Sequence, residues 1–178
     1  GVVEDRILEG AVPVSEQHGD VAVEVVRRHS IQGPVPVQVP QGHVLEVIHD
    51  DNALGVVSFD HDAYDVMPIT VAGPPVFGAG RAAAKTAVAG HTPNPSGLTA
   101  IGDGVERAHS HLASKTGYDI QAMIVFTDGH ETAADYIADV DHLINERVYG
   151  IGLGTADKIQ PAALTALTNG TGGYLLLT

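Results

Sequence analysis

From about Leu54 to its end, the chain alternates apolar runs of strand length with segments that have the period of an amphipathic helix. This alternation is the pattern expected of βα units around a mostly parallel sheet. The sequence therefore predicts an α/β protein. With 178 residues, of which 44% are hydrophobic, the chain is long enough to form one compact domain that buries most of its apolar surface.

The individual elements follow from the length and period of each run. The predicted strands cover residues 54–59, 64–71, 122–127, 148–153 and 174–177. The predicted helices cover residues 82–89, 101–112, 137–144 and 161–167. The first two strands are expected to form a hairpin, and Pro68 indicates that the second of them is an edge strand, where a missing backbone amide is tolerated.

The beginning of the chain follows a different pattern, rich in proline and valine. Its prolines are Pro13, Pro34, Pro36 and Pro40. Between them lie alternating stretches such as residues 21–26 and 34–39, which are typical of edge-type strands and loops. We therefore divide the chain into an atypical, β-rich N-terminal segment, residues 1–43, which packs on the sheet, and a domain formed by residues 44–178.

The charge and the residue types limit what the chain can bind. Only 9 basic residues oppose 22 acidic ones, so a net charge of −13 argues against nucleic acid and anionic membranes as partners. No apolar run is long enough for a membrane span and no signal peptide is visible, so we expect a soluble protein. Cysteine is absent while histidine numbers 10, which leaves imidazole and oxygen donors for divalent cations.

Three segments, in this order, resemble the von Willebrand factor A family of bacterial type. They are residues 55–60 (GVVSFD), 97–104 (GLTAIGDG) and 124–129 (IVFTDG). Residues 149–154 and 172–177 are also similar to the last two strands of bacterial members. The resemblance implies a three-layer, doubly wound, Rossmann-like sheet with a metal-ion-dependent adhesion site (MIDAS) at the edge where its parallel strands end.

In that family, the site combines an Asp-x-Ser-x-Ser loop after the first strand, a threonine from a later loop and an aspartate after the fourth strand, which hold Mg²⁺ or Mn²⁺. By motif position, Thr99 and Asp128 match the last two elements. The Asp-x-Ser-x-Ser motif is absent, so the usual first strand is missing or replaced. The gap must be filled by the N-terminal segment or by a strand from another subunit, and we therefore expect a homodimer.

Two clusters of potential metal ligands follow predicted strands. Residues 128–131 bring two carboxylates and an imidazole into one loop, and residues 60–62 form an Asp-His-Asp turn at the tip of the hairpin. The predicted metal ligands are Asp60, His61, Thr99, Asp128 and His130. If the protein is an enzyme, His130 and Glu131 are its expected catalytic residues. The alternative readings are a loop whose acidic residues only cap a helix, and a solvated turn.

Three other sequence features do not support a functional site. His109 and His111 are two positions apart on a predicted helix, point in nearly opposite directions and cannot chelate one ion together. The glycines of residues 150–154 lack the spacing of a nucleotide-binding loop, so no organic cofactor is expected. No serine lies in a nucleophile motif, so any catalysis would depend on a metal.

Three functions remain open. The first is a binding module that holds a protein or small-molecule ligand through a degenerate or rebuilt divalent-metal site, with Mg²⁺ or Mn²⁺ implied by the resemblance. The second is a small hydrolase of activated esters or phosphoesters that uses Zn²⁺ or Mn²⁺ and a metal-bound hydroxide. The third is a structural remnant without a ligand. The resemblance also implies a secreted or cell-surface origin.

Overall fold

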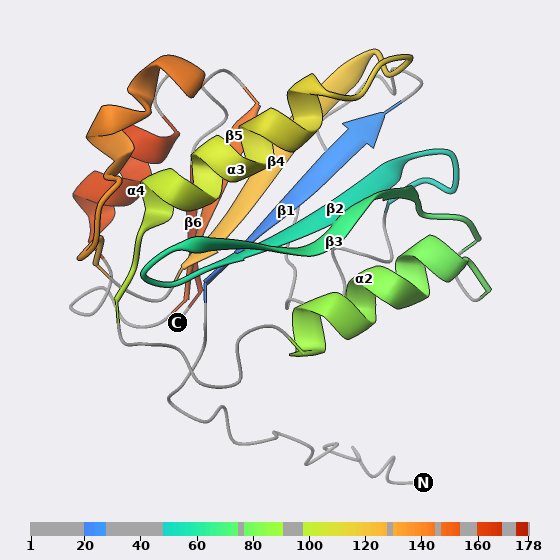
Figure 1. The fold of residues 1–178 in the computed structure, drawn as a ribbon, viewed down its shortest axis with the longest axis horizontal. Coiled ribbons are helices and arrows are strands. Elements are labelled where there is room, and N and C mark those ends of the chain that lie inside the picture. Colours follow the sequence, from blue (N-terminus) through green and yellow to red (C-terminus); the bar gives the residue numbers. More distant parts are fainter. Residues whose placement is uncertain are drawn as a thin grey trace, which may run out of the picture.

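The computed structural model describes residues 20–27, 48–74, 77–90, 98–127, 130–144, 147–153, 160–168 and 174–177. These residues form a six-stranded sheet with helices on both faces (Figure 1). The strands are β1 (Asp20–Arg27), β2 (Ala53–Phe59), β3 (Ala63–Val71), β4 (Ile120–Thr127), β5 (Val148–Leu153) and β6 (Tyr174–Leu177). The α-helices are α2 (Ala79–Gly90), α3 (Ile101–Ala113) and α4 (Pro161–Leu167). The α/β, three-layer fold is therefore confirmed.

The sheet has the order β3-β2-β1-β4-β5-β6. Strands β4, β5 and β6 are parallel, and β2 has the same direction because β1 pairs antiparallel with both β2 and β4. The predicted hairpin is confirmed, since β2 and β3 pair antiparallel and Pro68 lies in the outermost strand. Four of the six strands therefore share one direction, while β1 and β3 run opposite to it.

Strand β1 shows how the gap left by the missing first strand is filled. Residues 20–27 of the same chain lie at the centre of the sheet, with Asp20 opposite Phe59 of β2 and Val21 opposite Phe126 of β4. The prediction of an edge-type strand here was wrong, because no proline interrupts residues 20–27 and both sides of the strand can donate to neighbours. Residues 34–39 lie outside the described part. The homodimer stays a prediction. The argument that a strand from another subunit is needed no longer supports it, because β1 of the same chain fills the centre of the sheet.

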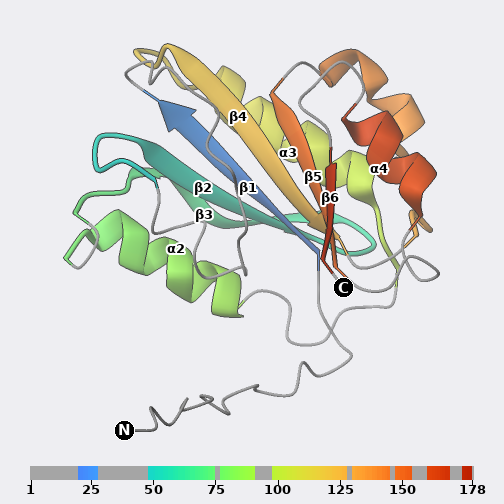
Figure 2. The ribbon, with the colours of Figure 1, turned by 180° about the vertical axis from the view of Figure 1, so that it is seen from behind.

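Alternating side chains of the sheet pack against different helices. Val57 and Phe59 share one apolar cluster with Val105 of α3. Leu54 and Val56 of the same strand share the other cluster with α2 residues. When the molecule is turned, α2 lies in front of the sheet and α3 behind it (Figure 2). With helices on both faces, every residue of β2 is buried, which explains its uninterrupted apolar sequence.

One predicted helix is wrong. The stretch 137–144 forms two short 3₁₀ helices, η1 (Ile137–Asp139) and η2 (Asp141–Leu143), instead of a single α-helix. Ile137 and Val140, whose spacing suggested a helical face, are both buried. A spacing of three residues fits a 3₁₀ turn as well as an α-helix, because side chains three positions apart eclipse each other there.

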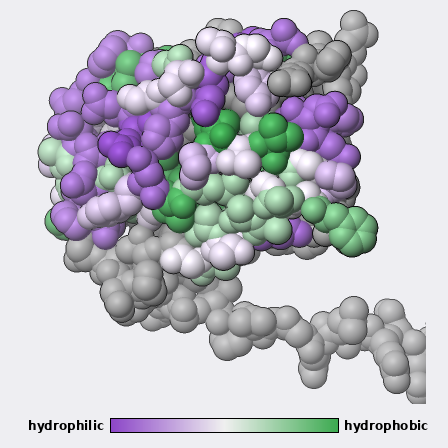
Figure 3. All heavy atoms as spheres, turned by 45° about the vertical axis from the view of Figure 1, so that its right-hand side comes forward, coloured by the Kyte–Doolittle hydropathy of each residue, from purple (hydrophilic) through white to green (hydrophobic). Residues whose placement is uncertain are grey.

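Helix α2 is fastened to the sheet by a buried arginine. Arg81 is 1% exposed, and its Nη2 donates hydrogen bonds to the carbonyl oxygens of Ile48 (2.6 Å) and Gly73 (3.1 Å). The same nitrogen lies 3.5 Å from a carboxylate oxygen of Asp50. The outer surface of α2 is mildly apolar because of its alanines (Figure 3). No helix in the described ranges is long and apolar enough to cross a membrane.

Candidate functional site

The edge of the sheet where β2, β4 and β5 end, here called the carboxyl edge, gathers three loops. Strand β2 ends at Phe59 and β4 at Thr127, and β1 lies between them with its first residue, Asp20, at this edge. Because β1 runs opposite to its neighbours, its beginning lies where their ends lie. The loops that follow β2 and β4 therefore flank the start of β1.

A backbone hydrogen bond joins the loop after β2 to the loop before α3. The amide of Ala100 donates to the carbonyl oxygen of Asp60 at 2.6 Å. Helix α3 begins at the next residue, Ile101, so the first turn of α3 is anchored at the carboxyl edge. Because Thr99 is the neighbour of Ala100, this contact places Thr99 near Asp60. Both residues are predicted metal ligands.

The loop after β4 is joined to the same place through Thr99. The amide of Thr99 donates to Oγ1 of Thr132 at 2.9 Å, and the amides of Thr132 and Ala133 donate to the Thr99 carbonyl at 2.9 and 3.2 Å. These bonds use the backbone of Thr99 and not its hydroxyl. The structure therefore brings the loops that contain Asp60, Thr99 and Thr132 together at the carboxyl edge.

Asp60 and His61 form a pair in which the carboxylate is buried and the imidazole is not. The side chain of Asp60 is 7% exposed and that of His61 is 52% exposed, and His61 Nδ1 lies 2.7 Å from Asp60 Oδ1. The same oxygen accepts the His61 amide at 2.5 Å. On the other side of the ring, Nε2 lies 3.3 Å from the hydroxyl of Tyr64. Desolvation and the carboxylates of Asp60 and Asp62 raise the pKa of Tyr64.

Glu131 has a structural position. Its Oε1 accepts the amide of Ile137 at 2.6 Å, at the start of η1, and the carboxylate also accepts the amide of Gly102 in the first turn of α3. Partial burial raises the pKa of Glu131, although these two hydrogen bonds act in the opposite direction. The carboxylate thus ties the loop after β4 to α3, which is the capping role that the sequence left open as an alternative.

Two other predicted residues are less constrained. His130 is exposed at the start of the described part of its loop. Asp128 lies outside the described residues. In the part of the chain that the structure describes, no group of three ligand atoms within 4.8 Å of one another includes Asp60, His61 or His130. The three loops meet, but these side chains do not form a closed ligand cage.

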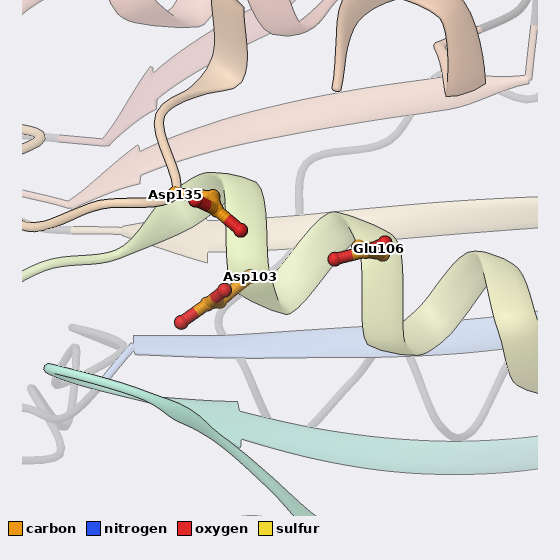
Figure 4. A group of neighbouring side chains, drawn as sticks. All are labelled: Asp103, Glu106 and Asp135. Carbon is orange, nitrogen blue, oxygen red and sulfur yellow. The ribbon is translucent and has the colours of Figure 1, made fainter. Parts of the chain in front are cut away.

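An acidic group that the sequence did not predict lies next to this edge. Ligand atoms of Asp103, Glu106 and Asp135 lie within 4.8 Å of one another (Figure 4). Partial burial and the neighbouring charges of Asp135, Asp62 and Glu106 raise the pKa of Asp103, against a hydrogen bond from the Asp135 backbone. The spacing of Asp103 and Glu106 predicts that they share a helix face, but no sequence signal brings Asp135 to them.

Comparisons with known proteins agree with this architecture. The profile of the von Willebrand factor type A domain matches residues 43–175. No curated protein sequence is significantly similar to the chain. Two solved structures match at a TM-score of 0.52 and 22% identity, both of proximal thread matrix protein 1 (PTMP1) from the mussel byssus. One has a zinc-occupied MIDAS motif.

The coverage of the PTMP1 structures is unequal. The matches extend over 68% and 67% of this chain but only 29% of the PTMP1 chain. The chain therefore spans less than a third of the length of the protein that it matches.

Proposed function

We propose that this chain, which belongs to the von Willebrand factor type A domain family, binds a divalent cation at its carboxyl edge and holds a protein or small-molecule ligand through that cation. The observation that carries the proposal is the joining of three loops at one edge of the sheet. Asp60 is linked to Ala100, and Thr99 to Thr132, by hydrogen bonds of 2.6 to 2.9 Å.

The donors at this edge suit a divalent cation. Asp60 supplies carboxylate oxygen, Thr99 a hydroxyl, and His61 and His130 imidazole nitrogens, and all of these are ligand types that Zn²⁺ or Mn²⁺ accepts. A cation held there would supply a positive centre with room for a carboxylate oxygen of the bound ligand. The acidic side chains of Asp62, Asp103 and Asp135 nearby make the local potential negative, which attracts cations.

The reversal of β1 suggests how the site is rebuilt. Family members carry their Asp-x-Ser-x-Ser loop where the first strand ends, whereas here the beginning of β1 lies at that edge. Asp20 is the residue of β1 at that position. We expect Asp128, the family-matched aspartate after β4, to take part in the site.

The hydrolase hypothesis gains no separate support. Its expected proton shuttle, Glu131, accepts the backbone amides of Ile137 and Gly102. A carboxylate that holds two amides at a helix start is poorly placed to exchange protons with a substrate. We therefore put binding first and do not propose a reaction.

Isothermal titration of the full chain with Mn²⁺, Zn²⁺ and Mg²⁺ tests the proposal. The wild type should bind one equivalent of cation, and Asp60→Asn and Asp128→Asn should each weaken binding at least about tenfold. Asp51→Asn is the matched control, because Asp51 is an exposed carboxylate beside His49, on the segment before β2 and so at the opposite edge. Absence of binding by the wild type, or an equal loss in the control, would refute the proposal.

A further inference from the structure

A large apolar side chain projects from the turn between β3 and α2. Phe77 is 88% exposed, whereas the other large hydrophobic residues that are exposed in the described part of the chain are between 41% and 50% exposed. Val71, near the same turn, is 50% exposed, and Pro74 between them is also exposed. Because burial of apolar surface is favourable, a ring left in water marks a surface that a partner can cover.

The turn that carries Phe77 is held in one shape by its backbone. The amide of Gly78 donates to the carbonyl oxygen of Pro74 at 2.7 Å. Gly73 has a φ of 72°, and a Cβ atom added to it would lie 2.9 Å from Cα of Gly78, so the chain closes on itself where side chains are missing. A turn that is already fixed loses little conformational entropy when a partner covers it, which favours its use in binding.

The sequence around this turn lacks acidic residues. All 22 Asp and Glu residues lie outside residues 66–102, although the whole chain has a net charge of −13. The Lys and Arg residues of that stretch are Lys85 and Arg81, and Arg81 is buried. Asp50 borders the turn, but its carboxylate lies 3.5 Å from Nη2 of Arg81, which offsets its charge. The turn therefore belongs to a part of the surface where the negative charge of the chain is weakest.

Helix α2 continues this surface. Its buried residues are Gly80, Arg81 and Ala84, and its opposite side is exposed and mildly apolar (Figure 3). By the helical period, the outer row of α2 consists of Ala79, Ala82, Thr86 and Ala89, all of them exposed. We call the surface formed by this row together with Val71, Pro74 and Phe77 the α2 face.

We propose that two copies of this chain pair through the α2 face, with Phe77 of each copy packed against α2 of the other. Copies that each carry a charge of −13 repel one another, and this repulsion is weakest where no acidic residue lies. A basic partner would instead be attracted to the acidic carboxyl edge. A second copy brings the same acid-free, apolar face, and a two-fold axis buries both exposed rings at once.

The position of the turn keeps this interface apart from the proposed cation site. Val71 pairs with Ala53, the first residue of β2, so the turn lies at the edge opposite to the carboxyl edge. Pairing through the α2 face therefore leaves both carboxyl edges of the dimer accessible. A dimer with two accessible sites can hold a ligand that has two binding epitopes more tightly than one copy can.

Sedimentation equilibrium of the full chain tests the proposal. The wild type should form dimers, and Phe77→Ser should raise the Kd of the dimer at least about thirtyfold. Ala82→Glu should raise it about tenfold or more, because it places like charges in the interface. The matched controls are Leu98→Ser, which removes another exposed apolar side chain, and Ala162→Glu, which changes an exposed alanine of α4. Both should leave the Kd unchanged. Added salt should tighten the wild-type dimer by screening the repulsion between the copies.

Spin labels locate the interface directly, because the chain has no cysteine and a single one can be labelled cleanly. Labels on Thr86→Cys, in α2, should lie closer together in the dimer than labels on Ser110→Cys, an exposed position of α3 on the other face of the sheet (Figure 2). A wild type that stays monomeric at hundreds of micromolar would overturn the proposal. So would a dimer that Phe77→Ser and Ala82→Glu leave intact, or one in which the Ser110→Cys labels are the closer pair.

Discussion

The ring of Phe59 lies directly against Gly104, so that a Cβ atom added to Gly104 would come within 2.6 Å of Cδ1 of Phe59. Phe59 is fully buried and is followed by Asp60, whose carbonyl binds Ala100 just before α3. The close approach of the two residues therefore sets how near α3 lies to the end of β2. A larger side chain at Gly104 should therefore move α3 relative to the end of β2 and so alter the carboxyl edge.

Gly104→Ala should destabilise the protein although alanine is the better helix former. Overpacking of a buried ring costs about 1–3 kcal/mol, which exceeds the roughly 0.5–1 kcal/mol that alanine contributes in a helix. Gly90→Ala is the control, since nothing lies within 4 Å of the added methyl group. Urea unfolding should show a lower midpoint for the first variant only. A neutral or stabilising Gly104→Ala would mean that Phe59 and α3 do not pack as closely as described.

Arg81→Ala should cost about 3–5 kcal/mol of the free energy of unfolding. The substitution removes the donor for the Ile48 and Gly73 carbonyls and leaves a cavity under α2. Arg107→Ala provides the comparison, because Arg107 forms an exposed pair with Asp65, and such pairs contribute about 0–1 kcal/mol. Thermal unfolding of both variants measures the difference. Equal losses of unfolding free energy in the two variants would show that the burial of Arg81 does not increase its contribution to stability.

The pair formed by Asp65 and Arg107 predicts a pH dependence. The hydrogen bonds from Arg107, outweighing partial desolvation, lower the pKa of Asp65, and His111 acts in the same direction as Arg107. A lowered pKa means that the stabilisation is present above the unfolded pKa of about 3.9 and is lost as the pH falls through the folded pKa. Asp65→Asn should therefore unfold slightly more easily than the wild type at pH 7, and the difference should vanish in acid. A difference that persists in strong acid would contradict this account.

For Asp103 we expect the opposite pH dependence of stability, because its pKa is raised and not lowered. Desolvation and its acidic neighbours raise its pKa, so the folded state binds a proton more readily than the unfolded state, and stability is lost as the pH rises through the folded pKa. Asp103→Asn should stabilise the protein by about 0.2–0.5 kcal/mol at pH 7, despite losing a favourable charge in the first turn of α3. The gain should disappear near pH 3. A loss of stability at pH 7 would mean that the helix dipole outweighs the repulsion.

Much of the fold could be predicted because the relevant signals are local. The boundaries of β5 and α4 follow from an apolar run and from a proline in the first helical turn, and the structure has the predicted ranges. The stretch from Ile137 to Leu143 was misread because a spacing of three residues does not distinguish an α-helix from successive 3₁₀ turns. The central place of β1 was only one of two alternatives, beside a strand from another subunit, because pairing partners distant in sequence leave no trace in periodicity.

The candidate site was predictable only in part. Asp60 and Thr99 were expected at the same edge because Asp60 follows the end of a strand and Thr99 precedes the start of a helix. The hydrogen bond from the Ala100 amide to the Asp60 carbonyl agrees with this expectation. The capping position of Glu131 and the approach of Asp135 to Asp103 depend on how the loop after β4 packs on α3. That packing comes from Gly102, whose missing side chain leaves room for the Asp135 and Tyr136 backbone, and no sequence pattern announces it.

The most direct test of a cation site at the carboxyl edge is paramagnetic broadening of backbone amide resonances by Mn²⁺ added in substoichiometric amounts. The account predicts that the amides of His61, Ala100 and Thr132 broaden first, because the three loops they belong to meet at this edge. The amides of Asp51 and Leu112, near the opposite edge, should keep their intensity, and excess Zn²⁺ should reverse the broadening. Broadening confined to the opposite edge, or spread evenly over the exposed carboxylates, would contradict the account.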